Sequence, residues 1–304
     1  MEILNPDKLN IDFVKKFKFF GIISIVVGVL SLISIFKPGF NYGIDFKGGV
    51  EAHLAFGQEQ VTPQDIRDLL SEKTSNVTIV EIDSAANKEF FVTIQEDDAD
   101  AFSKFLSQSL KAKYADKAQV LQLDSVGPKI GAELRKSALL SIIYTCILIC
   151  IYMYWRFDMR YAPGALLSIF HDLVLTFGFL IATQMEFTTA TVAALLTLAG
   201  YSINDTVVVF DRIREIEGKL LGSDRNTIVN RAINSTLSRT VMTSVTTLIS
   251  CAVLYFVGGE SLREFSATLF FGVVVGTYSS VFVAAPSYLL GDSWIKGQPK
   301  TKTA

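Results

Sequence analysis

The chain has 304 residues, of which half are hydrophobic and only 19% are charged, and its mean hydropathy is +0.39. Soluble domains usually carry about 25% charged residues, so this composition indicates a membrane protein. The net charge of −2 provides no basic field for nucleic acid, and the three cysteines show neither a disulfide framework nor metal-ligand spacing.

Six apolar runs are long enough to cross a hydrocarbon core, which takes roughly 18 helical residues or more. They cover about residues 19–36, 137–155, 161–182, 188–210, 237–257 and 265–290. Lysine and arginine gather in cytoplasmic loops of membrane proteins, and the four basic clusters all fall on one side of these spans. We therefore expect a cytoplasmic N-terminal segment over 1–18, a cytoplasmic loop at about 211–236 and a cytoplasmic tail over 291–304.

The stretch between the first two spans, residues 37–136, has no lipid-length run and is expected on the opposite, extracytoplasmic side. Strands are predicted at "GVEAHLAF", "NVTIVEID", "KEFFVTIQ" and "AQVLQLDSV", and helices at "TPQDIRDLLSEK" and "DADAFSKFLSQSLKAKY". Thr62 is expected to cap the first of these helices, with Pro63 at its first position. The order βαββαβ is that of an α+β, ferredoxin-like domain, inserted here into a polytopic α-helical membrane protein.

Two glycine-containing motifs lie where the chain leaves the membrane and where it returns. "GIDFKGG" precedes the first strand of the domain, and "SVGPKIGAEL" follows the last. Glycine permits positive φ and close backbone approach, although a plain structural junction is an alternative for each motif. Together the motifs would form a paired hinge, built from Gly43, Asp45, Gly48, Gly49, Gly127, Pro128 and Gly131.

Polar residues in the fourth and fifth spans are the main candidates for function. The fourth span places Thr197, Tyr201 and Asp205 on one face, with Asn204 beside them. A carboxylate inside a lipid-length segment is costly unless it has a partner or a task, and Arg239 on the fifth span is a candidate counter-charge. Taken singly, Asp205 could be a capping residue and Arg239 a side chain that snorkels to the headgroups. An acid and a base on successive spans favour a buried pair on an ion or proton path.

The third and sixth spans each carry a further candidate feature. His171 and Asp172 lie near the centre of the third span, where a proton-relay role and a hydrogen-bonded interior histidine are both open. On the sixth span, Gly272 and Gly276 belong to a ridge of small residues that lets another helix approach closely. Internal packing is the favoured interpretation of this ridge, and a partner interface is the alternative.

The blocks "GIDFKGG", "SVGPKIGAEL", "GYSINDTVVVFDRIRE" and "NSTLSRTVMTS" resemble the signature blocks of the SecD/SecF protein-export membrane proteins, in the right order from about Tyr42 to Pro286. That family belongs to the resistance-nodulation-division (RND) class of proton-driven transporters. The resemblance implies an RND-type half-bundle of six helices with a ferredoxin-like external domain. It also implies that Asp205 and Arg239 support proton-coupled function.

The resemblance further implies partners and a mechanism. A SecF-type chain would pair with SecD in the inner (plasma) membrane, and the pair would join the SecYEG translocon and act on a translocating unfolded polypeptide. Protonation of Asp205 would switch its contact with Arg239 and swing the external domains, with the proton gradient in place of any cofactor.

Other functions remain open on the residues themselves. One is an RND-like exporter of small molecules or lipids that works as an oligomer, and another is a structural scaffold with an external binding module. No enzyme, metal site or nucleic-acid partner is expected, because Walker, HExxH and GxSxG motifs are absent from the sequence.

Overall fold

The computed structural model describes residues 11–57, 61–71, 77–83, 88–94, 99–114, 117–158, 160–220 and 222–297. Residues 1–10 of the segment expected over 1–18 and residues 298–304 of the tail expected over 291–304 lie outside these residues. The chain forms two compact units. One comprises residues up to Asn41, Leu140–Glu186 and the residues from Ala190 onward, and the other comprises Tyr42–Leu139 with Phe187–Thr189.

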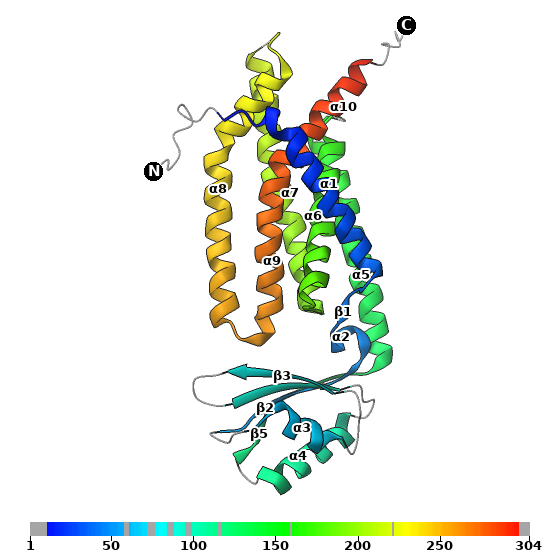
Figure 1. Ribbon diagram of the computed structural model, residues 1–304. Coiled ribbons are helices and arrows are strands. Elements are labelled where there is room, and N and C mark those ends of the chain that lie inside the picture. Colours follow the sequence, from blue (N-terminus) through cyan, green and yellow to red (C-terminus); the bar gives the residue numbers. More distant parts are fainter. Residues whose placement is uncertain are drawn as a thin grey trace. The chain divides into compact units, whose positions relative to one another are not determined.

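Six helices are long and apolar enough to cross a membrane, which confirms the predicted number of spans. Figure 1 shows them as α1 (Phe17–Phe36), α5 (Pro128–Arg156), α6 (Ala162–Thr183), α7 (Thr189–Lys219), α8 (Arg225–Val257) and α9 (Glu260–Ser279). The last continues through a π-helical segment, η3 (Ser280–Ala284), into α10 (Ala285–Gly297). Helices α5 and α8 begin well before the predicted spans, because their first turns are polar and hydropathy counts only the apolar part of a helix.

The six helices differ in burial within this chain. More than half of the apolar stretch is buried in α6, in α7 and in the span that α9 begins, but at most 17% in α1, α5 and α8. Exposed apolar side chains on α1 and α5 need no cover in a bilayer, since lipid tails are as apolar as leucine. The chain therefore has an inner layer of α6, α7 and α9, which holds most of the buried polar residues that the structure describes.

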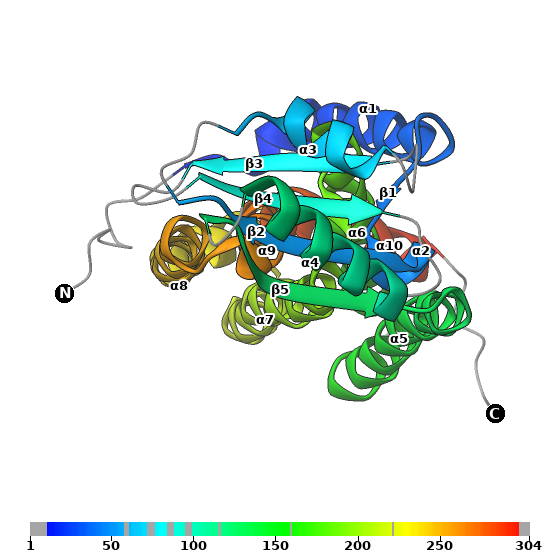
Figure 2. The ribbon, with the colours of Figure 1, turned by 90° about the horizontal axis from the view of Figure 1, so that it is seen from below.

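The second unit contains a four-stranded antiparallel sheet. Its strands are β2 (Gly49–Ala55), β3 (Val77–Asp83), β4 (Lys88–Ile94) and β5 (Gln119–Val126), in the order β3-β4-β2-β5. Helices α3 (Pro63–Leu70) and α4 (Ala99–Tyr114) lie over one face of this sheet (Figure 2). This is the split βαβ order, so the predicted ferredoxin-like fold is confirmed.

Register explains the core of this unit. Val50, Ala52 and Leu54 of β2 pair with Ile94, Val92 and Phe90 of β4, and period-two alternation turns all six to one face. They are buried together with side chains from the two helices, namely Ile66, Leu70, Phe102, Leu106 and Leu110.

The start of α3 confirms the predicted cap. Thr62 accepts a hydrogen bond from the Asp65 backbone N–H, and the Asp65 carboxylate accepts one from the Thr62 backbone, which forms a capping box. Pro63 occupies the first helical position. Hydrogen bonds from Thr62 also lower the pKa of Asp65, so the carboxylate is charged at the positive end of the helix dipole.

The two glycine motifs pack directly against each other within the second unit. Ile44–Lys47 forms one short helical turn, α2, where the sequence indicated only a turn before the strand. Gly48 has φ +79° and Gly49 φ +135°, whereas Gly43 has ordinary negative φ. A Cβ on Gly48 would lie 2.8 Å from the Cα of Pro128, and a Cβ on Gly131 would lie 3.1 Å from the Gly48 nitrogen. Motion at this contact remains a prediction.

Asparagines on α8 hold the N-terminal segment by its backbone. The Asn234 amide accepts from the Ile11 N–H at 3.0 Å and donates to the Ile11 carbonyl at 2.9 Å. One turn earlier, the Asn230 amide oxygen accepts from the Phe13 N–H at 2.8 Å. The Phe13 ring then packs against Phe282, with centroids 6.1 Å apart. We call this set of contacts the asparagine clamp.

Alanine at position 48 should destabilise the junction of the two motifs. The change forces an L-residue into the left-handed region, which costs about 1–2 kcal/mol, and adds a clash with Pro128. The unfolding temperature of the detergent-solubilised full chain should fall by roughly 5 °C or more. Gly127→Ala is the matched control, because nothing lies within 4 Å of a Cβ there. Equal melting of the two variants would show that the close approach does not matter.

Candidate functional site

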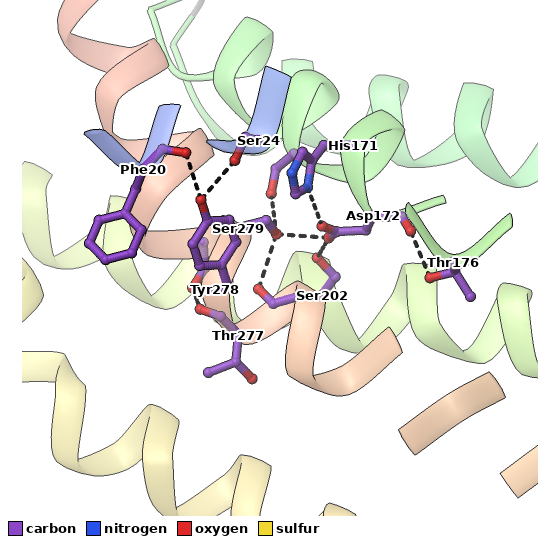
Figure 3. Close-up of polar contacts among 12 residues, drawn as sticks. Phe20, Ser24, His171, Asp172, Thr176, Ser202, Thr277, Tyr278 and Ser279 are labelled. Carbon is purple, nitrogen blue, oxygen red and sulfur yellow. Dashed lines mark hydrogen bonds and ion pairs between the residues drawn. The ribbon is translucent and has the colours of Figure 1, made fainter. Parts of the chain in front are cut away.

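The Asp172 carboxylate joins three helices at one point (Figure 3). It lies on α6 with 1% of its surface exposed, and its Oδ1 is 3.1 Å from the Nδ1 of His171. Its Oδ2 accepts a hydrogen bond from the Ser202 hydroxyl of α7 and another, 2.8 Å long, from the Ser279 hydroxyl of α9. Side chains of α6, α7 and α9 thus all contact this carboxylate. We call the four side chains of Asp172, His171, Ser202 and Ser279 the Asp172 node.

Small residues make this meeting of helices possible. A Cβ on Gly276 would lie 3.0 Å from the Cβ of Ser202, and one on Gly272 would clash with Leu198, so both glycines lie tightly against α7. Ser168 of α6 adds a 2.9 Å hydrogen bond to Ser279. Close backbone approach lets short serine side chains reach a buried carboxylate, which is costly in an apolar interior without such donors.

Three successive residues at the end of α9 contact three different helices. Thr277 bonds the Ser244 hydroxyl of α8 at 2.7 Å, and Ser279 reaches Asp172 of α6. Between them, the Tyr278 hydroxyl donates to the Phe20 carbonyl of α1 at 2.8 Å and bonds the hydroxyl of Ser24, also on α1, at 2.8 Å (Figure 3). Successive helical residues point about 100° apart, so one turn can serve three neighbours. The π-helical segment η3 begins at the next residue, and π-helical turns are frequent at functional sites.

Asp205 lies one turn beyond Ser202 on α7 and has a different environment. Only 3% of its surface is exposed, and its Oδ2 is buried without a hydrogen-bond partner among the described residues. The hydroxyls of Thr206 and, on α8, Thr240 are buried and unpartnered in the same sense. Buried polar atoms are nearly always hydrogen-bonded, so the lack of partners here marks a position that the isolated chain leaves incomplete.

The register of α7 against α8 places Arg239 near Asp205. Tyr201 donates to Ser244 at 3.4 Å and Arg212 donates to Ser235 at 2.9 Å, so the two helices run antiparallel with Asp205 at about the level of residue 240. The Arg239 guanidinium attracts the carboxylate electrostatically. Within the described parts of the chain, however, no ion pair joins the two, and Arg239 is exposed. The structure therefore brings the predicted pair close together but does not connect it.

The exposed face beside this pair is polar. Thr243 and Thr246 of α8 donate to backbone carbonyls one turn back, both at 3.1 Å, and Ser250 does the same. Asn204, predicted beside Asp205, is exposed on α7. We call Arg239, Thr243, Thr246 and Ser250 the α8 polar stripe. The three hydroxyls are satisfied locally, and within the described chain Arg239, Thr246 and Ser250 are exposed while Thr243 is half-buried.

Asp45 of the first glycine motif has a partner that the sequence did not indicate. Its carboxylate accepts hydrogen bonds from the backbone N–H and the hydroxyl of Thr189, at 2.8 and 2.6 Å. Thr189 is the first residue of α7, the helix that also carries Ser202 and Asp205. An acidic side chain at a helix start satisfies free N–H groups and suits the helix dipole.

Sequence reasoning missed Ser202, Tyr278 and Ser279. Ser279 lies two turns after Gly272 and one turn after Gly276 on the same helix. This spacing places it on the ridge of small residues and could have identified it from the sequence. No group of three or more His, Cys, Asp or Glu that could hold a metal ion occurs among the residues that the structure covers. The site is a hydrogen-bonding arrangement built from two carboxylates, one imidazole and several hydroxyls.

Comparisons with known proteins identify the family. The model for "Protein export membrane protein SecD/SecF, C-terminal" matches residues 106–292, and the "SecD/SecF GG Motif" model matches residues 33–58. Protein translocase subunit SecF of Desulfurispirillum indicum is 40% identical over 270 residues, with 86% of each chain covered. That of Calditerrivibrio nitroreducens is 40% identical over 294 residues, covering 94% of this chain and 95% of the relative.

Solved structures agree with this assignment. The crystal structure of SecDF from Thermus thermophilus matches with a TM-score of 0.84 at 35% identity, over 95% of this chain and 39% of the SecDF chain. A second structure, of SecDF in a super-membrane-facing form, matches with a TM-score of 0.71 at the same identity. The chain covers about two fifths of the length of these SecDF chains, but 86% and 95% of the length of the two SecF relatives. It is a multi-pass membrane protein that belongs to the SecD/SecF family, and the two relatives that it matches along most of their length are SecF subunits.

Proposed function

We propose that this chain is the SecF subunit of a SecD/SecF assembly that uses the proton gradient to assist protein export through the SecYEG translocon. The observation that carries the proposal is Asp205, a carboxylate buried in a membrane span with an unpartnered oxygen, beside the exposed charge of Arg239. The relatives named protein translocase subunit SecF support the export role.

Protonation of Asp205 changes the force between α7 and α8. The charged carboxylate attracts Arg239, whereas the neutral acid does not, so a proton that binds there weakens the attraction and lets the helices separate. Moving one charge through 100 mV supplies about 2.3 kcal/mol. Because about 1.4 kcal/mol is tenfold in an equilibrium, this can bias a two-state arrangement about fifty-fold. A protein without a nucleotide site can therefore still perform work.

The partner is SecD, and we infer that it covers the α8 polar stripe. A charged side chain within a span is costly if lipid surrounds it, so the exposed Arg239 favours a protein surface opposite the stripe. The matching SecDF chains are about two and a half times as long as the part that this chain covers, which leaves room there for a second half.

Transport work requires the external unit to move relative to the spans. The packed glycine contact between Gly48 and Gly131 is the candidate hinge, and Asp45 links the same motif to the start of α7. The two SecDF structures match this chain with different TM-scores at equal identity, which supports more than one arrangement in the family. The ferredoxin-like unit would face outward from the inner membrane and act on the translocating unfolded polypeptide, with both chain ends cytoplasmic.

Replacing Asp205 with Asn should abolish proton-dependent export while the protein still inserts and binds SecD. Asparagine keeps the shape of the side chain but cannot exchange a proton, so stimulation of export by the gradient should fall by about tenfold or more. The measurement is translocation of a secreted precursor into inverted membrane vesicles, with and without a proton gradient. Asp211→Asn is the control, since Asp211 lies on the same helix but is exposed and paired with Arg156. Normal stimulation in the Asp205 variant would refute proton coupling at this residue.

A bulky residue on the α8 polar stripe should displace SecD. Thr246→Trp adds an indole to the inferred interface, and the amount of SecD that co-purifies with the tagged chain should fall several-fold. Leu148→Trp on α5 is the control, because that side chain is exposed on an apolar face that lipid can cover. Undiminished SecD in the Thr246 variant would place the interface elsewhere. Recovery of further copies of this chain in place of SecD would favour the oligomeric exporter.

A further inference from the structure

We propose that Asp172 and His171 form a second proton-binding site, separate from Asp205. This site binds Ser202 of α7 and Ser279 of α9 most strongly when it is deprotonated. The inference deepens the proposed function, since it takes the proton gradient as the driving force. It assigns the gradient a second binding site, inside this chain.

The charge on this pair is not balanced by its surroundings. With a neutral imidazole, the Asp172–His171 pair carries one negative charge, and Asp172 is 1% exposed. The titratable groups nearest to it on the packed helices are Tyr278 of α9, which stacks on the His171 ring, and Asp205 of α7, one turn from Ser202. Among the described α1 residues that line the same groove as His171, Lys18, near the start of the helix, is the charged one. In the described chain, none of these three forms an ion pair with Asp172.

One proton removes that imbalance. A lone negative charge in an apolar interior is strongly unfavourable, so the pair gains most from a single added proton. The uptake step is balanced: one proton enters from water, the net charge of the pair changes from −1 to 0, and no covalent bond between heavy atoms changes. Since Oδ1 and Nδ1 are only 3.1 Å apart, the proton belongs to the pair and not to either residue alone.

The geometry leaves one nitrogen free to receive the proton. Nδ1 of His171 faces Asp172, and Nε2 on the opposite edge of the ring is buried without a hydrogen-bond partner among the described residues. His171 is 9% exposed and lines an apolar groove of about 620 Å³ between α1, α6 and the segment from η3 into α10. An imidazole with a free ring nitrogen can accept a proton there, so the pair offers a proton-driven assembly a binding position.

Protonation of the pair changes the strength of its hydrogen bonds to two helices, α7 and α9. The added proton reduces the net charge around the Asp172 carboxylate whether it rests on His171 or is shared by the pair, and charge-assisted hydrogen bonds weaken as that charge falls. When the pair becomes neutral, the bonds from Ser202 and Ser279 weaken, and α7 and α9 are freer to shift against α6. Asp205 lies three residues after Ser202, so any shift of α7 moves Asp205 relative to Arg239. The two proton sites are thereby linked through α7.

Proton uptake by the purified SecD/SecF assembly tests this inference. Wild type, Asp172→Asn and Asp205→Asn are titrated between pH 5 and pH 9 with an indicator dye in weak buffer. Each variant should take up about one proton fewer than wild type, and the double variant about two fewer, because each substitution removes one titrating site. Surface groups contribute equally to all four proteins and cancel in the difference.

Two further variants separate binding of the proton from mere packing. His171→Gln can still donate to Asp172 but cannot bind a proton, so the midpoint of the Asp172-dependent uptake should shift by about one pH unit or more. It also keeps the carboxylate and its serine bonds, so it serves if Asp172→Asn does not assemble. Ser168→Ala is the control, since that hydroxyl donates to Ser279 and not to Asp172, and its midpoint should stay at the wild-type value.

The outcomes distinguish this inference from the proposed function. Wild-type uptake in Asp172→Asn, together with loss of one proton in Asp205→Asn, would overturn the second site and leave proton coupling at Asp205 standing. Loss of one proton in Asp172→Asn but none in Asp205→Asn would support the second site and count against the role proposed for Asp205. An unchanged midpoint in His171→Gln would overturn the pair as the binding unit.

Discussion

The membrane half of this protein depends on the hydrogen bonding of one carboxylate. Asp172 is buried where α6, α7 and α9 meet, and water cannot solvate it there, so protein hydroxyls must. That requirement brings serines within reach of it, and the serines in turn require glycines that allow the helices to approach closely. The neighbours of Ser279 along α9 then fix the positions of α1 and α8. The hydrogen bonds of this carboxylate and of the last turn of α9 thus connect five of the six spans.

The two membrane carboxylates of the chain solve the same problem in opposite ways. Asp172 has its donors within the chain, whereas Asp205, one turn away along α7 from a residue of the Asp172 node, has an oxygen with none in the described structure. Asp205 lies beside a face of α8 that is polar and uncovered. The first carboxylate therefore has its donors inside the chain, and the second lies beside the face of α8 that we propose SecD covers. Helix α7 carries Asp205 and also Ser202, which binds Asp172, so a shift of α7 changes the surroundings of both carboxylates.

Much of this architecture could be predicted from the sequence. Hydropathy gave six spans, strand alternation gave the ferredoxin-like order, and Thr62 with Pro63 marked a helix start. Asp172, Asp205 and Arg239 were also found, because a charged residue in an apolar run is conspicuous. Their partners were not found, because hydropathy measures the length of a helix but not its rotation about its axis. Neither the contact of Ser279 with Asp172 nor the lack of an ion pair between Asp205 and Arg239 in the described chain could be predicted from the sequence. The bond between Asp45 and Thr189 spans 144 positions and has no local pattern.

The asparagine clamp has a consequence for how the start of the chain can vary. Asn230 and Asn234 bind the N–H and carbonyl groups of residues 11–13, which every amino acid except proline presents alike. Substitutions in that segment other than to proline therefore leave the polar contacts intact, while the insertion or loss of a single residue between residue 13 and α1 would move the backbone out of register with both amides. Spacing, and not residue identity, is what natural variation in this segment should preserve, apart from the apolar side chain that packs on Phe282.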